Sequence, residues 1–235
     1  MLYKIADFIV DVPTAGGLAS RCEKYEKAEI SLADIIIREE DYCLDRLKGA
    51  SEDIVAYMES AYQFYLGLIK HGGIYLHSSA IELDGKAYLF SGPSGVGKST
   101  HTRLWQQIFG ERAKVFNDDK PALRCIDGRW YAYGTPWCGK DSININMKVP
   151  LAGICFLKQG HENRIRRLSS IEALPLFLTQ TLRRRLKVDE LDMMLTTADR
   201  LLREIPIFEL ENRPEPAAAQ LSYETMRRAA EEAGL

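Results

Sequence analysis

The stretch KAYLFSGPSGVGKSTHTRLWQQIF, residues 86–109, decides what kind of fold the chain can adopt. Residues 92–99 satisfy the pattern GxxxxGK[ST] in full. An apolar, strand-forming run precedes the pattern, and a run with helical spacing of apolar residues follows it. The succession of strand, glycine loop and helix predicts a phosphate-binding loop rather than an ordinary tight turn.

The residue types in this loop are the ones that polyphosphate binding requires. Glycines allow backbone angles at which successive N–H groups turn toward an anion, and the following helix adds its positive end. Lys98 supplies a point charge for the β- and γ-phosphates, and the Ser99 hydroxyl can ligate Mg²⁺. The predicted nucleotide contacts are Gly92, Ser94, Gly95, Val96, Gly97, Lys98, Ser99 and Thr100.

An acidic pair follows about twenty residues later. Asp118 and Asp119 end an apolar run in VFNDDKPAL, residues 115–123, so we expect them at a strand edge. Such close carboxylates raise each other's pKa unless a cation lies beside them, and Mg²⁺ or Lys120 could serve. The alternative is a solvated acidic turn. His77, upstream of the loop, is either a hydrogen-bonded core residue or part of the same site.

Strand patterns alternate with helical ones along the rest of the chain. Two apolar runs flank Asp84-Gly85, which predicts a β-hairpin. Strands are expected at 2–10, 33–39 and 152–159 and within 114–133 and 206–211, and helices at 51–71, 99–110, 170–186, 189–204 and 215–232. This order predicts an α/β fold with a β-sheet of mixed direction.

Composition excludes several classes of protein. The 235 residues include 31 basic and 33 acidic ones, and a net charge of −2 gives no general attraction to nucleic acid or to a membrane surface. No run of eighteen apolar residues is present, and the five cysteines show no metal-binding spacing. We expect a cytoplasmic protein with free thiols.

The segment HSSAIELDGKAYLFSGPSGVGKST, residues 77–100, followed by NDDK at 117–120, resembles the kinase domain of the HPr kinase/phosphorylase family. The likeness covers 71–160 well and 160–210 loosely. It is nearest to the shorter HPr-kinase-like proteins, which include kinases of lasso-peptide precursors. The resemblance implies a mixed-sheet P-loop kinase core over 71–235, related to phosphoenolpyruvate carboxykinase. A small N-terminal α+β accessory element, 1–70, would pack on it.

The resemblance also implies a function and roles for residues. It implies a Mg²⁺-dependent kinase that transfers the γ-phosphate of ATP, with GTP as an alternative, to a Ser/Thr hydroxyl of a peptide or protein. Asp118 would deprotonate that hydroxyl, Asp119 would hold the metal together with Ser99, and His77 and Lys98 would complete the catalytic group. The family also forms homo-oligomers. A small-molecule alcohol as acceptor, or a non-catalytic nucleotide-sensing module, are the alternatives.

Two further segments allow two interpretations each. YGTPWCGK, residues 133–140, is either a loop that closes over a substrate or an ordinary structural turn. LRRRLK, residues 182–187, is either a surface that attracts an anionic peptide or a solvated helix face.

Overall fold

The computed structural model describes the chain except for residues 14–16, 30–31, 44–48, 140–141 and 183–185. Its helices and strands follow one another in this order: β1 (Leu2–Ile5), β2 (Phe8–Asp11), α1 (Gly17–Cys22), β3 (Ile35–Ile36), α2 (Glu52–Lys70), β4 (Ile74–Tyr75), β5 (Ser78–Leu83), β6 (Lys86–Ser91), α3 (Lys98–Phe109), β7 (Lys114–Asp119), β8 (Ala122–Ile126), β9 (Arg129–Tyr133), β10 (Lys148–Gln159), β11 (Arg164–Leu168), α4 (Ser170–Thr179), α5 (Val188–Glu204), β12 (Ile207–Asn212) and α6 (Pro216–Glu232).

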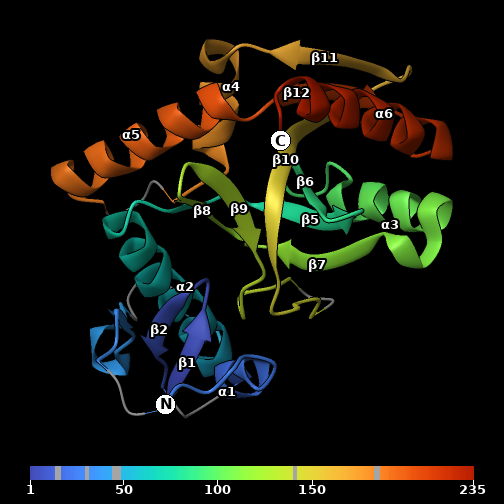
Figure 1. Ribbon diagram of the computed structural model, residues 1–235. Helices are drawn as coiled ribbons and strands as arrows, with labels where there is room; N and C mark the ends of the chain where they lie inside the picture. The colour runs from blue at the N-terminus through green and yellow to red at the C-terminus, as the bar shows by residue number, and fades with distance from the viewer. Residues whose placement is uncertain (14–16, 30–31, 44–48, 140–141, 183–185) are drawn as a thin grey trace.

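A nine-stranded sheet forms the centre of the molecule, with strands in the order β4-β8-β9-β10-β6-β5-β7; β12 also pairs with β10, and β11 pairs with β12. The long strand β10 is parallel to β6 and β12 but antiparallel to β9. Figure 1 shows β10 running through the middle of the molecule. It connects the strands β4, β8 and β9 to the strands β6, β5 and β7. The predicted α/β fold with a sheet of mixed direction is confirmed.

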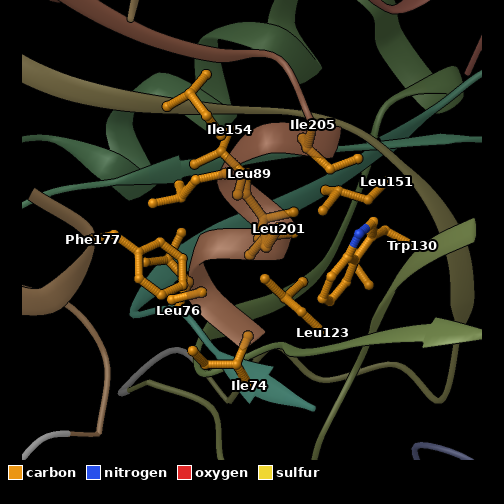
Figure 2. Close-up of a cluster of buried hydrophobic side chains, with 14 of the residues drawn as sticks. Ile74, Leu76, Leu89, Leu123, Trp130, Leu151, Ile154, Phe177, Leu201 and Ile205 are labelled. Carbon is orange, nitrogen blue, oxygen red and sulfur yellow. The ribbon is translucent and has the colours of Figure 1, made fainter. Parts of the chain in front are cut away.

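Strand β6, which leads into the glycine loop, is buried on both faces. Leu89 belongs to a cluster with Phe177 of α4 and Leu201 of α5, as Figure 2 shows. On the opposite face, the Phe90 ring lies 5.3 Å from the Trp105 ring of α3, centroid to centroid. Successive side chains of a strand point to opposite faces, so a strand covered by helices on both sides is apolar throughout. This explains the unbroken AYLF run before the loop.

The hairpin predicted at Asp84-Gly85 is confirmed. These two residues connect β5 to β6, which pair in an antiparallel register. Both have positive φ, 53° for Asp84 and 77° for Gly85, as a tight two-residue hairpin turn requires.

The N-terminal residues form a separate three-stranded sheet, β1-β2-β3. Figure 1 places it at the bottom of the view, beside α2. The single strand predicted at 2–10 is wrong, because Ala6 and Asp7 adopt positive φ (52° and 61°) and turn the chain into a hairpin. The small sheet and α2 share a buried cluster with Trp137 of the core. The N-terminal segment is thereby joined to the rest of the chain through apolar contact.

The helix boundaries follow local sequence signals in most places. The Ser51 hydroxyl accepts from the Ile54 N–H and caps α2, which fits the predicted start of a helix at residue 51. Helix α4 ends at Thr179, earlier than the predicted 186, and the backbone carbonyl of the next residue, Gln180, accepts from the His77 N–H at 2.7 Å. The arginines of the 182–187 run, residues 183–185, lie outside the described residues. Across the part of the chain that the structure describes, no helix is long and apolar enough to cross a membrane.

Candidate active site

The order of the strands brings the glycine loop and the acidic pair to the same edge of the large sheet. Strand β5 pairs in an antiparallel manner with β6 on one side and β7 on the other, so β6 and β7 run parallel. Ser78 of β5 lies opposite both Ser91, which precedes the glycine loop, and Asp119, which ends β7. The carboxyl ends of parallel strands lie at the same edge. His77, directly before β5, therefore lies beside the loop and the acidic pair.

The glycine loop has the backbone that the motif predicts. Gly92, Gly95 and Gly97 have φ of 144°, 81° and 109°. At Gly92 a side chain would also be crowded, since a Cβ there would lie 3.0 Å from Val96 Cγ1 and 3.2 Å from the Leu157 carbonyl oxygen. Helix α3 begins directly after Gly97. The N–H groups of its first turn have no partners within the helix, and this is the usual anion-binding arrangement.

The loop and the acids line one cleft of about 600 Å³. Its lining contains the predicted residues His77, Ser94, Gly95, Gly97, Lys98, Ser99, Thr100, Asp118 and Asp119, together with Arg103 and Gly139. The other two predicted residues, Gly92 and Val96, line a neighbouring cavity on the other side of the loop. The structure thus brings nine of the predicted site residues into one space.

Lys98 is the first residue of α3, and its side chain bonds back to the glycine loop. Its ammonium donates to the carbonyl oxygens of Gly92 (3.0 Å) and Pro93 (3.3 Å). Burial lowers the pKa of Lys98, although the charges of Asp119 and Asp118 oppose that change. A partly desolvated cation between backbone carbonyls can exchange these weak acceptors for a phosphate, with which it forms a stronger, charge-assisted hydrogen bond.

Ser99 and Asp118 form a pair suited to a small, hard cation. The Ser99 hydroxyl donates to Asp118 Oδ2 at 2.9 Å. Adjacent oxygens around octahedral Mg²⁺, with Mg–O of 2.0–2.1 Å, are about 2.9 Å apart, so the pair fits this ion. Among the described residues no group of three or more His, Cys, Asp or Glu could hold a metal. Mg²⁺ does not need such a group, because it keeps several waters and binds substrate phosphates.

Asp119 is surrounded by donors. Its Oδ1 lies 3.0 Å from His77 Nε2, and its Oδ2 accepts from the Lys120 ammonium and lies 3.3 Å from the Tyr57 hydroxyl. Burial alone would raise the pKa of Asp119, but the bond from His77 and the Lys120 charge hold the pKa well below its usual value. This carboxyl group is therefore ionised at any physiological pH.

The backbone at Asp119 is strained. Its φ is 126°, a value that favours glycine and that costs a residue with a side chain about 1–3 kcal/mol. Such strain persists where surrounding contacts fix the residue, and it is concentrated at functional sites. The contacts to His77, Lys120 and Tyr57 fix it here.

Helices α1 and α2 support the acidic pair from outside the large sheet. The Tyr57 hydroxyl lies 3.0 Å from the Cys138 carbonyl oxygen and accepts from the Lys120 ammonium at 2.9 Å. Arg21 of α1 places its guanidinium 4.8 Å from the centre of the Tyr57 ring and donates to the same Cys138 carbonyl. Burial raises the pKa of Tyr57, so its hydroxyl remains a neutral donor.

Comparison with known sequences assigns the chain to a family. The family described as "SynChlorMet cassette protein ScmC" matches residues 43–212, which is more than half of the chain and includes the whole cleft. The chain belongs to the ScmC family. A search of curated protein sequences found no match for this ScmC-family chain.

A solved structure is also similar to this member of the ScmC family. It is the HPr(Ser) kinase/phosphatase from Coxiella burnetii, with 10% sequence identity and a TM-score of 0.40. The match covers 67% of this chain and 98% of that one.

The two interpretations of His77 are separated by its contacts. Its Nδ1 lies 3.0 Å from Gln180 Oε1, and its backbone N–H donates to the Gln180 carbonyl at 2.7 Å. Its Nε2 lies 3.0 Å from Asp119 Oδ1, so both ring nitrogens of His77 face oxygen atoms. In this ScmC-family chain the ring is held in place and lines the cleft, which favours a part in the site over a place in the core.

The segment 133–140 is packed rather than open, over the residues that the structure describes. Thr135, Trp137 and Cys138 are buried, and the Thr135 hydroxyl donates to the Lys120 carbonyl at 2.9 Å. The structural-turn interpretation is therefore favoured for 133–139. Lys140 lies outside the described residues.

Some site residues were missed by sequence reasoning in this ScmC-family chain. Arg103 lies one helical turn after Ser99, so the motif itself could have indicated it. Tyr57 and Gln180 are 62 and 103 residues away from their partners Asp119 and His77. No local pattern indicates contacts over such separations.

Proposed function

We propose that this chain is a Mg²⁺-dependent kinase that transfers the γ-phosphate of a nucleoside triphosphate to a hydroxyl group. ATP is the nucleotide to test first, and a Ser or Thr of a peptide or protein is the acceptor. The observation that carries the proposal is the 2.9 Å contact between the Ser99 hydroxyl and Asp118. It joins a complete phosphate-binding loop to a carboxylate within one cleft. Phosphoryl transfer consists mainly of positioning and charge stabilisation, and this cleft offers both.

The positive groups of the cleft would bind the triphosphate. The N–H groups of the loop and the start of α3 would hold the β-phosphate, and Lys98 would move from the loop carbonyls to the terminal phosphates. Arg103 lines the same cleft one turn further along α3. These charges neutralise the oxygens of the phosphate that is transferred.

The metal would be held by Ser99 and Asp118. Bound Mg²⁺ would supply positive charge that stabilises the negative charge of the phosphates. The sequence prediction paired Ser99 with Asp119 instead. In the structure both oxygens of Asp119 already face His77, Lys120 or Tyr57, so we assign Asp119 the role of a fixed negative charge beside the metal ligands.

Asp118 is also the group that we propose to orient the acceptor hydroxyl and take its proton. Asp119 is a poor proton acceptor, because its neighbours lower its pKa far below neutrality. Asp118 bonds to Ser99 through Oδ2, and a carboxylate has a second oxygen that can accept from a substrate. Asp118 would accept this proton as the hydroxyl oxygen bonds to the γ-phosphorus and as the bond from that phosphorus to the leaving nucleoside diphosphate breaks.

The experiment is an acceptor search. The family description names a cassette protein, so the products of the same gene cassette are the first acceptors to incubate with the purified chain, γ-labelled ATP and Mg²⁺. Label on a Ser or Thr, located by mass spectrometry, is the expected result. Label on a metabolite would replace the peptide acceptor with a small alcohol. Tight ATP binding with no transfer to any hydroxyl would favour the nucleotide-sensing module and contradict the kinase.

A further inference from the structure

A second cavity of about 470 Å³ lies on the other side of the glycine loop. We propose that it binds the nucleoside part of the nucleotide, that is, the base and its ribose. The inference rests on the proposed function, since it requires a polyphosphate in the loop. It adds the part of the site that distinguishes a nucleotide from inorganic polyphosphate.

The position of the cavity follows from the sheet. Strands β10 and β12 run parallel to β6, so their carboxyl ends lie at the same edge as the loop. The end of β10 supplies Leu157 and Gln159 to the cavity wall, and α4 supplies Leu176 and Thr179. In open α/β sheets, ligands bind at the carboxyl ends of strands. The acids occupy one side of the loop at this edge, and the cavity occupies the other.

The two spaces are continuous along the loop. Ser94 and Gly95 line both the catalytic cleft and the cavity. The Gln159 side chain donates to the Gly95 carbonyl at 3.3 Å, which ties the cavity wall to the loop. A ligand whose phosphates fill the loop can therefore extend past Ser94 and Gly95 into the cavity.

The lining has the chemistry of a base-binding pocket. Phe156 and Leu176 supply apolar surface, and the polar groups of Gln159, Gln180 and Glu209 lie around it. Nucleobases have apolar faces and a polar edge of donors and acceptors. Pockets for such ligands are mostly apolar, carry a few polar groups and have volumes of about 300–1,000 Å³.

The acceptor does not fit this cavity. Its hydroxyl must reach Asp118, and Asp118, Asp119 and His77 line the catalytic cleft on the other side of the loop. The cavity shares only the loop residues Ser94 and Gly95 with that cleft. The nucleoside therefore enters from the α4 side, and the acceptor enters from the side of the acids.

The test compares ATP with tripolyphosphate, which has the phosphates but no nucleoside. Leu176→Trp fills the cavity from α4, and Thr179→Trp does so from an exposed position, in case the first variant folds poorly. Ile171→Trp is the matched control, because Ile171 lies on the same helix, is 83% exposed and does not line the cavity. Affinities of each full-length protein are measured by calorimetry with Mg²⁺ present.

We expect the unmodified chain to bind ATP at least about tenfold more tightly than tripolyphosphate. The variants that fill the cavity should bind ATP no more tightly than tripolyphosphate, and their affinity for tripolyphosphate should be unchanged. Ile171→Trp should change the affinity for neither ligand. The inference is overturned if both folded cavity variants bind ATP as the unmodified chain does. If the chain transfers phosphate in that case, the proposed function stands and only the cavity assignment fails. If the unmodified chain binds neither ligand, both proposals fail.

Discussion

The two adjacent aspartates should respond in opposite ways to the same substitution. Asp119→Asn removes the charge that pairs with Lys120 and His77, whereas Asp118→Asn removes a charge bonded to the neutral Ser99 hydroxyl. Asparagine keeps the volume of aspartate, so each substitution removes one negative charge with little change in packing. The first variant should lose stability, and the second should lose phosphate transfer.

The size of the stability loss follows from burial. Removing one partner of a fully buried ion pair costs about 3–5 kcal/mol, because the other charge is left without compensation. The side chains of Lys120 and Asp119 are 16% and 24% exposed, so water compensates part of that cost. We expect Asp119→Asn to lower the free energy of unfolding by about 2–3 kcal/mol. For a chain of this size that corresponds to a drop in Tm of about 4–6 °C.

The assay is thermal unfolding followed by circular dichroism at pH 7, with urea unfolding as a second measure. Asp118→Asn is the matched control, and its Tm should stay within about 2 °C of the unmodified chain, as expected for loss of one partly exposed hydrogen bond. An Asp119→Asn variant with the same Tm as the unmodified chain would refute the reasoning. So would equal losses in the two variants, because the Lys120 and His77 contacts belong to Asp119 alone.

Three other predictions follow from the same contacts. Because His77 and Lys120 lower the pKa of Asp119 against the opposing effect of burial, the stability it contributes is complete above the ordinary Asp pKa. The Tm difference from Asp119→Asn should then be constant from pH 8 to about 5 and shrink below about pH 4; a difference that grows on acidification would contradict this. Lys98→Met should weaken ATP binding about 10- to 100-fold, because one charge-assisted contact to the phosphates is lost, and calorimetry measures this change. An unchanged affinity would show that the Lys98 ammonium stays on the loop carbonyls when ATP binds. Trp137→Ala should cost about 3–5 kcal/mol in urea unfolding, since the ring is fully buried and stacks on Phe64; a cost below about 1 kcal/mol would place Trp137 outside the shared core.

Local signals predicted most of the large sheet and the loop. The glycine pattern required a strand before it and a helix after it, and Asp84-Gly85 required a hairpin, so β5, β6 and α3 followed directly. The apolar pair Val115 and Phe116, followed by polar residues, placed Asp118 and Asp119 at a strand end. The structure adds that β5 lies between β6 and β7 and that these two strands run parallel, which brings the glycine loop and the acidic pair to one edge.

Contacts between distant segments could not be predicted in this way. Tyr57 reaches Asp119 from a helix whose sequence shows only a buried face, and Gln180 reaches His77 from a helix end that the 170–186 pattern did not mark. The turn at Ala6 and Asp7 contains no glycine, so its positive φ values gave no sequence signal. In each case tertiary contacts, rather than local preference, determine the conformation.

The rate of phosphate transfer in a single turnover, with the unmodified chain and with Asp118→Asn, tests the central claim most directly. The claim is that Asp118 orients and deprotonates an acceptor hydroxyl beside a triphosphate that the glycine loop holds. The account predicts transfer of label to an acceptor hydroxyl, a rate lower by about 10²- to 10⁴-fold in Asp118→Asn, and ATP affinity changed only a few-fold. Full transfer by Asp118→Asn would contradict it.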